Sequence, residues 1–267
     1  MSTYAIGDLQ GCYQPLQNLL ELIDYNTLSD KLWFTGDIVN RGPDSLACLR
    51  FVKNSPNCQI VLGNHDLHCL TAAYGYQPFH AKDTLTEILK APDADDLLQW
   101  LIQQPLLYHD PKFDYCLVHA GILPAWDLAT AKALALEAET ALQNDTQHFL
   151  KHLYGHQPDT WSATLTGMDR YRFIVNAFTR MRYCLSSTQL ELKSKMAPEH
   201  AERDLIPWFD VDSRKTKQCN IIFGHWASLN CQAGLPHIFA LDSGAVWGGK
   251  LTALRLEDGQ RFSVVGI

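Results

Sequence analysis

The sequence LWFTGDIVNRG, residues 32–42, contains the pattern that predicts the fold: a short apolar run that ends at a glycine followed by a polar side chain. The same pattern occurs at Thr3 to Ile6 and at Gln59 to Leu62. Between these runs, at about 16–23 and 44–53, apolar residues recur at helical spacing. This strand–helix–strand–helix–strand order predicts an α/β protein with a buried, largely parallel sheet and right-handed crossovers.

The remaining chain continues the alternation of strands and helices. We expect a polar helical region at about 67–107, a strand at Tyr115 to Val118 and a helix at about 129–143. Further strands are predicted near the end of the chain, at 220–223, 238–241, 250–256 and 261–265. We interpret residues 1–267 as one domain, in which a helical and loop insertion at about 125–212 caps the sheet.

The composition excludes several classes of protein. The 22 Lys and Arg residues against 29 Asp and Glu give a net charge of −7, which disfavours long nucleic acids as partners. No apolar stretch has the length of a membrane span, and the start of the chain has no signal-peptide pattern, so we expect a cytoplasmic protein without a membrane partner. The 8 cysteines include no Cys-x-x-Cys pair, which argues against a zinc ribbon.

Polar side chains follow the predicted strands in a repeated manner. Alone, each has an ordinary explanation, such as a Gly-Asp turn or a buried histidine at a strand end. Because the carboxyl ends of parallel strands lie at one edge of the sheet, these side chains should share that rim. In open α/β sheets this is the edge at which ligands bind. A set of oxygen and imidazole donors without thiolates suits Mn, Mg, Fe or Zn. The candidate ligands are too many for a single metal ion. The residues are Asp8, Gln10, Asp37, Asn64, His65, His119, His225 and Asp242.

Five segments resemble the motifs of the calcineurin-like metallophosphoesterases, the superfamily that includes the Ser/Thr protein phosphatases. They are Gly7-Asp8-Leu9-Gln10-Gly11, Gly36-Asp37-Ile38-Val39-Asn40-Arg41-Gly42, Gly63-Asn64-His65-Asp66, His119-Ala120-Gly121 and Phe223-Gly224-His225. Further segments are similar to the symmetrical bis(5′-nucleosyl)-tetraphosphatases, among them residues 176–182, 223–229 and 240–244. The resemblance implies a two-sheet β-sandwich flanked by helices. It also implies a cytosolic enzyme that splits diadenosine tetraphosphate (Ap4A) and related dinucleoside polyphosphates into two nucleoside diphosphates.

The resemblance also implies the cofactor and the role of each site residue. Two divalent metal ions are expected, with Mn²⁺ favoured over Co²⁺ or Mg²⁺, and they would activate a water that attacks phosphorus. Asp8, Gln10 and Asp37 would hold the first ion, and Asp37, Asn64, His119 and His225 the second. His65 would be the general acid. Phosphate would be bound by Arg41, Arg180 and Arg182, with Asn40 and Asp242 in supporting positions.

Two positions depart from the superfamily pattern. Gln10 stands where a histidine is usual, and its neutral amide oxygen is a weaker metal ligand. Asn40 replaces the aspartate that supports the catalytic histidine, so the pKa of His65 is expected to be lower than in the relatives.

The sequence is compatible with two other functions and with several adenine-stacking residues. The same site would also serve a protein Ser/Thr phosphatase, and Gln10 and Asn40 could mark a metal-poor binding protein on the same scaffold. Adenine could stack on any of several aromatic residues, namely Trp161, Phe178, Tyr183, Trp208, Trp226 and Trp247. The oligomeric state and the preference among dinucleotides are not indicated.

Overall fold

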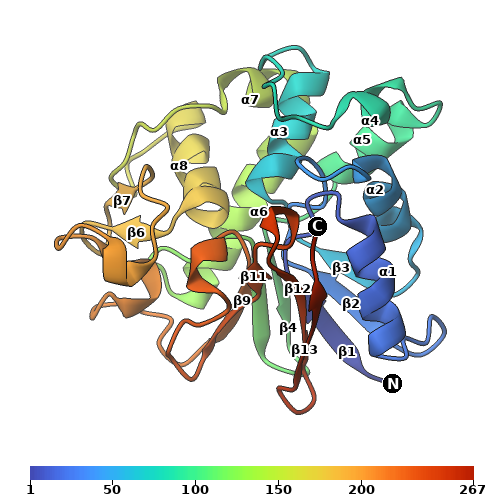
Figure 1. Cartoon of the computed structure of the whole chain (residues 1–267). Coiled ribbons are helices and arrows are strands. Elements are labelled where there is room, and N and C mark those ends of the chain that lie inside the picture. The colour runs from blue at the N-terminus through green and yellow to red at the C-terminus, as the bar shows by residue number, and fades with distance from the viewer.

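The computed structural model describes all 267 residues and contains two large sheets (Figure 1). In the first sheet the strand order is β11-β12-β1-β2-β3, and β13 pairs with β12. The three strands from the N-terminal part are parallel to one another, whereas β12 runs antiparallel to β1. The bounds are β1 Thr3–Ile6, β2 Lys31–Phe34, β3 Cys58–Ile60, β11 Asp242–Ser243, β12 Lys250–Arg255 and β13 Arg261–Val265.

The second sheet has the order β10-β9-β5-β4. Its strands β10, β9 and β5 are parallel, and β4 is antiparallel to β5. The bounds are β4 Leu107–Asp110, β5 Tyr115–Val118, β9 Asn220–Phe223 and β10 Ile238–Ala240.

The two sheets pack face to face through a small apolar core. Trp33 of β2 and Tyr108 of β4 meet edge to face, with ring centroids 5.2 Å apart. Trp33 belongs to a buried cluster that combines Ala5 and Leu254 from the first sheet with Leu117 and Ile222 from the second. Full burial of a side chain as large as leucine stabilises the fold by roughly 1.5–3 kcal/mol. The predicted β-sandwich is therefore confirmed.

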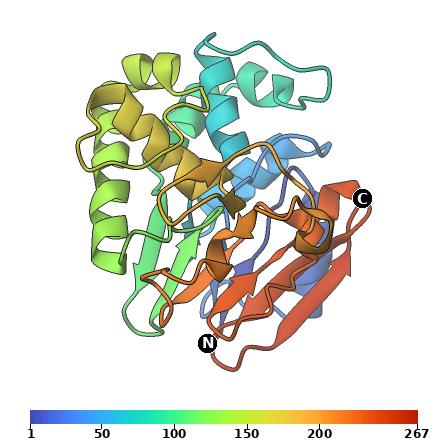
Figure 2. The ribbon, with the colours of Figure 1, turned by 90° about the vertical axis from the view of Figure 1, so that its left-hand side faces the viewer.

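Helices cover the outer faces of the sandwich. Helix α1 packs on β12 and β13 of the first sheet, and α6 packs on β4 of the second (Figure 2). Helices α3, α7 and α8 lie together above the sheets in Figure 1. The bounds are α1 Tyr13–Leu22, α2 Ser45–Asn54, α3 Asn64–Ala73, α4 Thr86–Lys90, α5 Ala94–Ile102, α6 Leu128–Asn144, α7 Thr146–His152 and α8 Gly167–Arg180.

The segment at 125–212 contains more than the predicted helices and loops. Besides helices α6 to α8, this segment contains a three-stranded sheet of order β7-β6-β8. Its strands, β6 Tyr183–Cys184, β7 Leu190–Glu191 and β8 Ile206–Pro207, have two residues each. Strands of this length have no alternation that a sequence pattern can reveal.

The other strands and helices agree closely with the prediction. Strands at 3–6, 115–118, 220–223 and 261–265 have the predicted bounds, and α6 covers the predicted helix at 129–143. The region at 67–107 is helical, but it ends in β4, which was not predicted. No helix of the structure has the length and apolar character needed to cross a membrane.

Candidate active site

The loops after the strands hold the site residues in an unusual backbone conformation. Several non-glycine residues have positive φ angles, a conformation that costs about 1 kcal/mol or more for each residue. They are Gln10 (43°), Asp37 (49°), Asn40 (81°), Arg41 (70°) and His225 (62°). The chain is also closely packed there, because a Cβ atom at Gly63 would collide with the carboxylate of Asp37. Strain concentrated in these loops is typical of a functional site.

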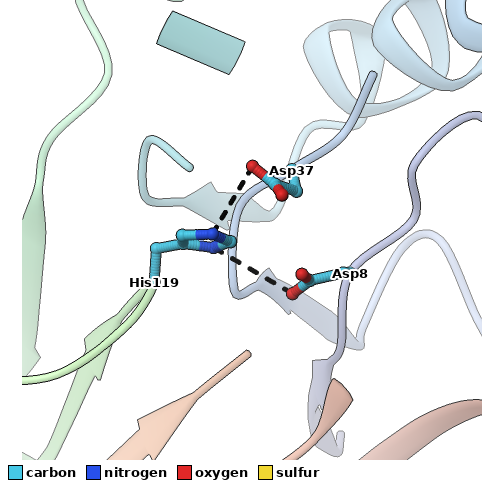
Figure 3. Close-up of side chains that lie close together, drawn as sticks. All are labelled: Asp8, Asp37 and His119. Atoms are coloured by element: carbon cyan, nitrogen blue, oxygen red, sulfur yellow. Dashed lines mark ion pairs between the residues drawn. The ribbon is translucent and has the colours of Figure 1, made fainter. Parts of the chain in front are cut away.

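Asp8, Asp37 and His119 form the centre of the site. One ligand atom of each lies within 4.8 Å of the others, and all three side chains are buried (Figure 3). Nδ1 of His119 is 4.0 Å from Oδ1 of Asp8, and Nε2 is 3.5 Å from Oδ1 of Asp37. The three residues come from the loops after β1, β2 and β5, so the fold brings predicted metal ligands together.

The carboxylates of this centre lie in an environment that disfavours their charge. Burial, followed by the neighbouring Asp242 and Asp37, raises the pKa of Asp8 well above its usual value. Burial also raises the pKa of Asp37, and it raises that of Asp242 to about 6. Buried carboxylates that repel one another need a compensating positive charge, which a divalent cation provides.

The two histidines direct lone pairs toward one point. Nδ1 of His119 lies 2.8 Å from the Thr35 carbonyl, and Nε2 of His225 lies 3.2 Å from that of Arg180. Because a carbonyl only accepts hydrogen bonds, these nitrogens carry the protons, and the other nitrogen of each ring has a free lone pair. Burial lowers the pKa of His119 to about 3 and lowers that of His225, so both rings are neutral and able to ligate a metal ion.

The amide of Asn64 lies opposite these lone pairs. One amide atom is 3.2 Å from Nε2 of His119 and 2.9 Å from Nδ1 of His225. With the nitrogen in that position, the amide would donate to both rings. With the oxygen there, three acceptors face one another, and only a cation can satisfy them. The donor set therefore fits a divalent ion.

Gln10 lies beside the same centre. Its Nε2 is 3.4 Å from Oδ2 of Asp37, so the amide nitrogen points at the carboxylate in this conformation. Rotation of the amide by 180° would turn the oxygen toward Asp37 instead.

His65 lies between Asp37 and Asn40. Its backbone N–H donates to Oδ1 of Asp37 at 2.7 Å, and its Nε2 is 4.0 Å from Oδ2. Nδ2 of Asn40 lies 3.1 Å from Nδ1 of His65. Burial lowers the pKa of His65 below its usual value, and the nearby Asp37 carboxylate acts against this shift.

A cavity of about 650 Å³ opens over this centre. The predicted ligands Gln10, Asp37, Asn64 and His225 line it, together with His65 and Asp242. Asp242 accepts a hydrogen bond from the backbone of Gly244 at 2.9 Å, so it supports its own loop.

The amino-acid sequence matches a known family of proteins. The family model for calcineurin-like phosphoesterases matches residues 1–228 of the chain. The chain belongs to the calcineurin-like phosphoesterase family. The predicted family and its fold are therefore confirmed.

Curated relatives of this phosphoesterase are similar over its whole length. Proteins named symmetrical bis(5′-nucleosyl)-tetraphosphatase occur in Cellvibrio japonicus (52% identical, 97% of each chain covered) and in Marinomonas sp. (51% identical, 98% of this chain and 96% of the relative). A third, from Legionella pneumophila strain Lens, is 52% identical and covers 100% of this chain and 98% of the relative. The phosphoesterase therefore belongs with these hydrolases, as predicted.

Solved structures support the fold of the phosphoesterase. A crystal structure provisionally described as a diadenosine tetraphosphatase has a TM-score of 0.67 and 25% identity, and covers 100% of this chain and 94% of the other. A protein serine/threonine phosphatase from Saccharomyces cerevisiae has a TM-score of 0.56 at 13% identity, with 100% and 79% covered, which shows a shared fold.

Cations surround the cavity of the phosphoesterase despite its net charge of −7. Nη2 of Arg182 donates to the carbonyl of His225 at 2.8 Å. Burial lowers the pKa of Arg182 to about 10, so its guanidinium stays charged at neutral pH. Nη1 of Arg180 donates to Asn176 at 3.0 Å. The cationic residues of the cavity are Arg41, Lys82, Arg180, Arg182 and Lys195.

Several residues of the cavity were not found from the sequence. His68, Lys82, Tyr154 and Lys195 line it, and Asp83 lies behind its wall in contact with Arg41. His68 lies one helical turn after Asn64 and His65 on α3, a spacing that could have drawn attention to it. The other four residues reach the site through tertiary packing, and their local signal is the basic and acidic pair Lys82-Asp83 between two helices.

Proposed function

We propose that this phosphoesterase hydrolyses Ap4A and related dinucleoside polyphosphates symmetrically and releases two molecules of ADP from Ap4A. The observation that carries the proposal is the buried Asp8–Asp37–His119 centre below a cation-lined cavity. Its relatives, about 50% identical over the full chain, have names that state this reaction.

The residues present fit two divalent metal ions. We assign Asp8, Gln10 and Asp37 to one ion, and Asp37, Asn64, His119 and His225 to the other, with Asp37 shared. Such ions, when bound, supply positive charge against phosphate oxygens and make a water molecule more acidic. We propose Mn²⁺, with Co²⁺ and Mg²⁺ as alternatives, because the ligands are oxygen and neutral imidazole.

The phosphate chain is held by the cations of the cavity. Arg41 engages another side chain through Nη1 alone, so its other N–H groups are available to phosphate oxygens. Arg180 and Arg182 lie on the same cavity from α8 and the residues after it. A cavity of about 650 Å³ has the size of a small-ligand site.

His65 is the residue that we assign to the leaving group. Its Nδ1 accepts from Asn40, so the neutral ring carries its proton on Nε2. We propose that this N–H donates a hydrogen bond to the departing phosphate oxygen. ADP leaves as a weakly basic anion, so a hydrogen bond stabilises it and full proton transfer is not needed. This refines the general-acid role implied by the family resemblance.

One of the aromatic candidates suits a nucleobase. Phe178, Tyr183, Trp208 and Trp226 are at most 1% exposed and belong to the core. Trp161 packs against Trp126, with ring centroids 5.0 Å apart. Trp247 is 60% exposed and lines the cavity. We propose that its indole stacks on one adenine.

Comparison of two substrates tests the proposal. The Mn²⁺-loaded protein should hydrolyse Ap4A much faster than a serine phosphopeptide, and the Asp37→Asn variant should hydrolyse neither. A faster reaction with the phosphopeptide would favour the protein phosphatase instead. A protein that binds Ap4A without hydrolysing it would favour the metal-poor binding protein.

A further inference from the structure

Asp83 is a buried carboxylate that contacts the site from a distant part of the chain. It lies in the loop between α3 and α4, 42 positions from Arg41, and its side chain is 1% exposed. Oδ1 accepts from Nδ2 of Asn40 at 3.0 Å and from Nη1 of Arg41 at 3.1 Å. Oδ2 accepts from the backbone of His80 at 2.8 Å and lies 2.7 Å from Nε2 of His68.

We propose that Asp83 is a positioning residue for the reaction, which holds the guanidinium of Arg41 and, through Asn40, the imidazole of His65. The inference rests on the proposed function, because it assigns Arg41 to phosphate and His65 to the leaving group. It adds a residue that neither the motifs nor the metal centre contain.

The first argument is the backbone conformation of Asn40 and Arg41, which Asp83 and Thr84 hold in place. Asn40 and Arg41 are consecutive non-glycine residues with φ of 81° and 70°, a conformation that only surrounding contacts can maintain. Oδ1 of Asn40 accepts from the backbone N–H groups of Arg41 at 2.8 Å and of Thr84 at 3.1 Å. Asp83 and Thr84 therefore bind both amide atoms of Asn40 and fix the loop.

The second argument is the direction of the hydrogen bonds. Because two backbone N–H groups bind Oδ1 of Asn40, its Nδ2 must face the other way and donate. The two hydrogens of Nδ2 go to Asp83 and to Nδ1 of His65. The imidazole is thereby held as the tautomer with the proton on Nε2, which is the nitrogen that the leaving group requires.

The third argument is charge. The side chain that contacts Nδ1 of His65 is the amide of Asn40, which carries no charge. In the structure a carboxylate lies one hydrogen bond farther away, at 3.0 Å from the Asn40 amide. Burial would raise the pKa of Asp83, but hydrogen bonds from His68, His80 and Asn40 outweigh burial and lower it to about 2. Asp83 is thus an anion at the pH of the reaction.

Replacement of Asp83 tests the proposal by steady-state kinetics. Asp83→Asn keeps the shape of the side chain, and we expect kcat on Ap4A to fall about 10- to 100-fold with a smaller change in KM, because Arg41 and His65 act in the transition state. Asp93→Asn is the matched control, because Asp93 pairs with Arg50 outside the cavity. Equal kcat values for the two variants would overturn the proposal.

A charge exchange separates positioning from general stability. Asn40→Asp alone places two carboxylates together and should lower kcat. The double variant with Asn40→Asp and Asp83→Asn places one negative charge at position 40, next to His65. Its kcat should be at least about tenfold higher than the product of the two single effects predicts. If the double variant is as slow as the product of both single effects, the proposal is wrong.

A third measurement needs no substrate, so it is independent of the proposed function. Long-range ¹⁵N NMR spectra of the imidazoles should show His65 with Nε2 protonated and Nδ1 bare in the unaltered protein. In the folded Asp83→Ala variant, Nδ2 of Asn40 and the loop that carries Thr84 both lose the Asp83 carboxylate as a partner, so we expect a mixture of tautomers. An unchanged His65 spectrum in that variant would contradict the proposal even if Ap4A proved not to be the substrate.

Discussion

Nε2 of His119 lies 3.5 Å from Oδ1 of Asp37, and neither side chain is more than 2% exposed. The Nδ1 of the same ring is engaged by the Thr35 carbonyl, so two acceptors face each other in the interior. A divalent cation bound beside them would satisfy the lone pairs of both side chains. The pKa of His119 is about 3, so the ring is neutral at neutral pH and its Nε2 can bind a metal ion. The pair therefore fits a metal site.

Asp37→Asn should abolish most of the activity, because Asp37 is the ligand that we assign to both ions. We expect kcat to fall about 10²- to 10³-fold or more. Metal analysis after Mn²⁺ loading and gel filtration should find about two ions for each chain of the unaltered protein and fewer for the variant. Full metal content in the variant would show that Asp37 is not a ligand.

The same substitution should stabilise the metal-free protein. A carboxyl group whose pKa is raised by folding destabilises the fold as the pH rises from the unfolded value, about 4, through the folded one. Burial raises the pKa of Asp37, so an uncharged amide at this position removes a penalty at pH 7. With a chelator present, the melting temperature of Asp37→Asn should exceed that of the unaltered protein. Added Mn²⁺ should reverse the order.

His65→Ala tests the leaving-group assignment. We expect a loss of about 10²- to 10⁴-fold in kcat with Ap4A, at unchanged metal content. The effect should be largest for substrates whose leaving group is more basic than ADP, because these need the hydrogen bond most. An unaltered kcat would remove His65 from the mechanism.

Trp247→Ala should weaken substrate binding. Stacking of one base contributes about 1–3 kcal/mol, so KM for Ap4A should rise about 5- to 150-fold with little change in kcat. Trp247→Phe retains an aromatic face and serves as the control, with a smaller increase in KM. If both variants bind Ap4A as the unaltered protein does, the adenine lies elsewhere in the cavity.

Asp83 should give stability a distinct pH dependence. Its pKa is lowered on folding to about 2, so its ionised form stabilises the fold above the unfolded value of about 4. That contribution disappears as the pH falls from about 4 to 2. Urea unfolding should therefore find Asp83→Asn less stable than the unaltered protein at pH 7. The difference should shrink toward zero near pH 2, and a constant difference would contradict the pKa.

The sequence predicts those parts of the site that have a local signal. Asp8, Asp37 and Asn64 each follow a short apolar strand and a glycine, so their place on one rim could be derived from the pattern. Asp83 could not be derived, because it reaches Asn40 across 43 positions and follows no strand. Among the tryptophans, Trp226 is 1% exposed and Trp247 is 60% exposed, a difference that only tertiary packing decides.

The same reasoning explains what was predicted of the fold. The strands β1, β5 and β9 are mostly apolar, as expected for strands buried in the sandwich, and they were predicted with their bounds. The strands β6, β7 and β8 have two residues each and depend on pairing partners far along the chain. Their sequence contains no period from which they could be predicted.

Product analysis tests the central claim most directly. The Mn²⁺-loaded protein is incubated with Ap4A at low conversion, and the nucleotides are separated by anion-exchange chromatography. Attack at a phosphorus beside the central bridging oxygen predicts ADP alone, in twice the amount of Ap4A consumed. AMP and ATP in equal amounts would contradict the proposed function.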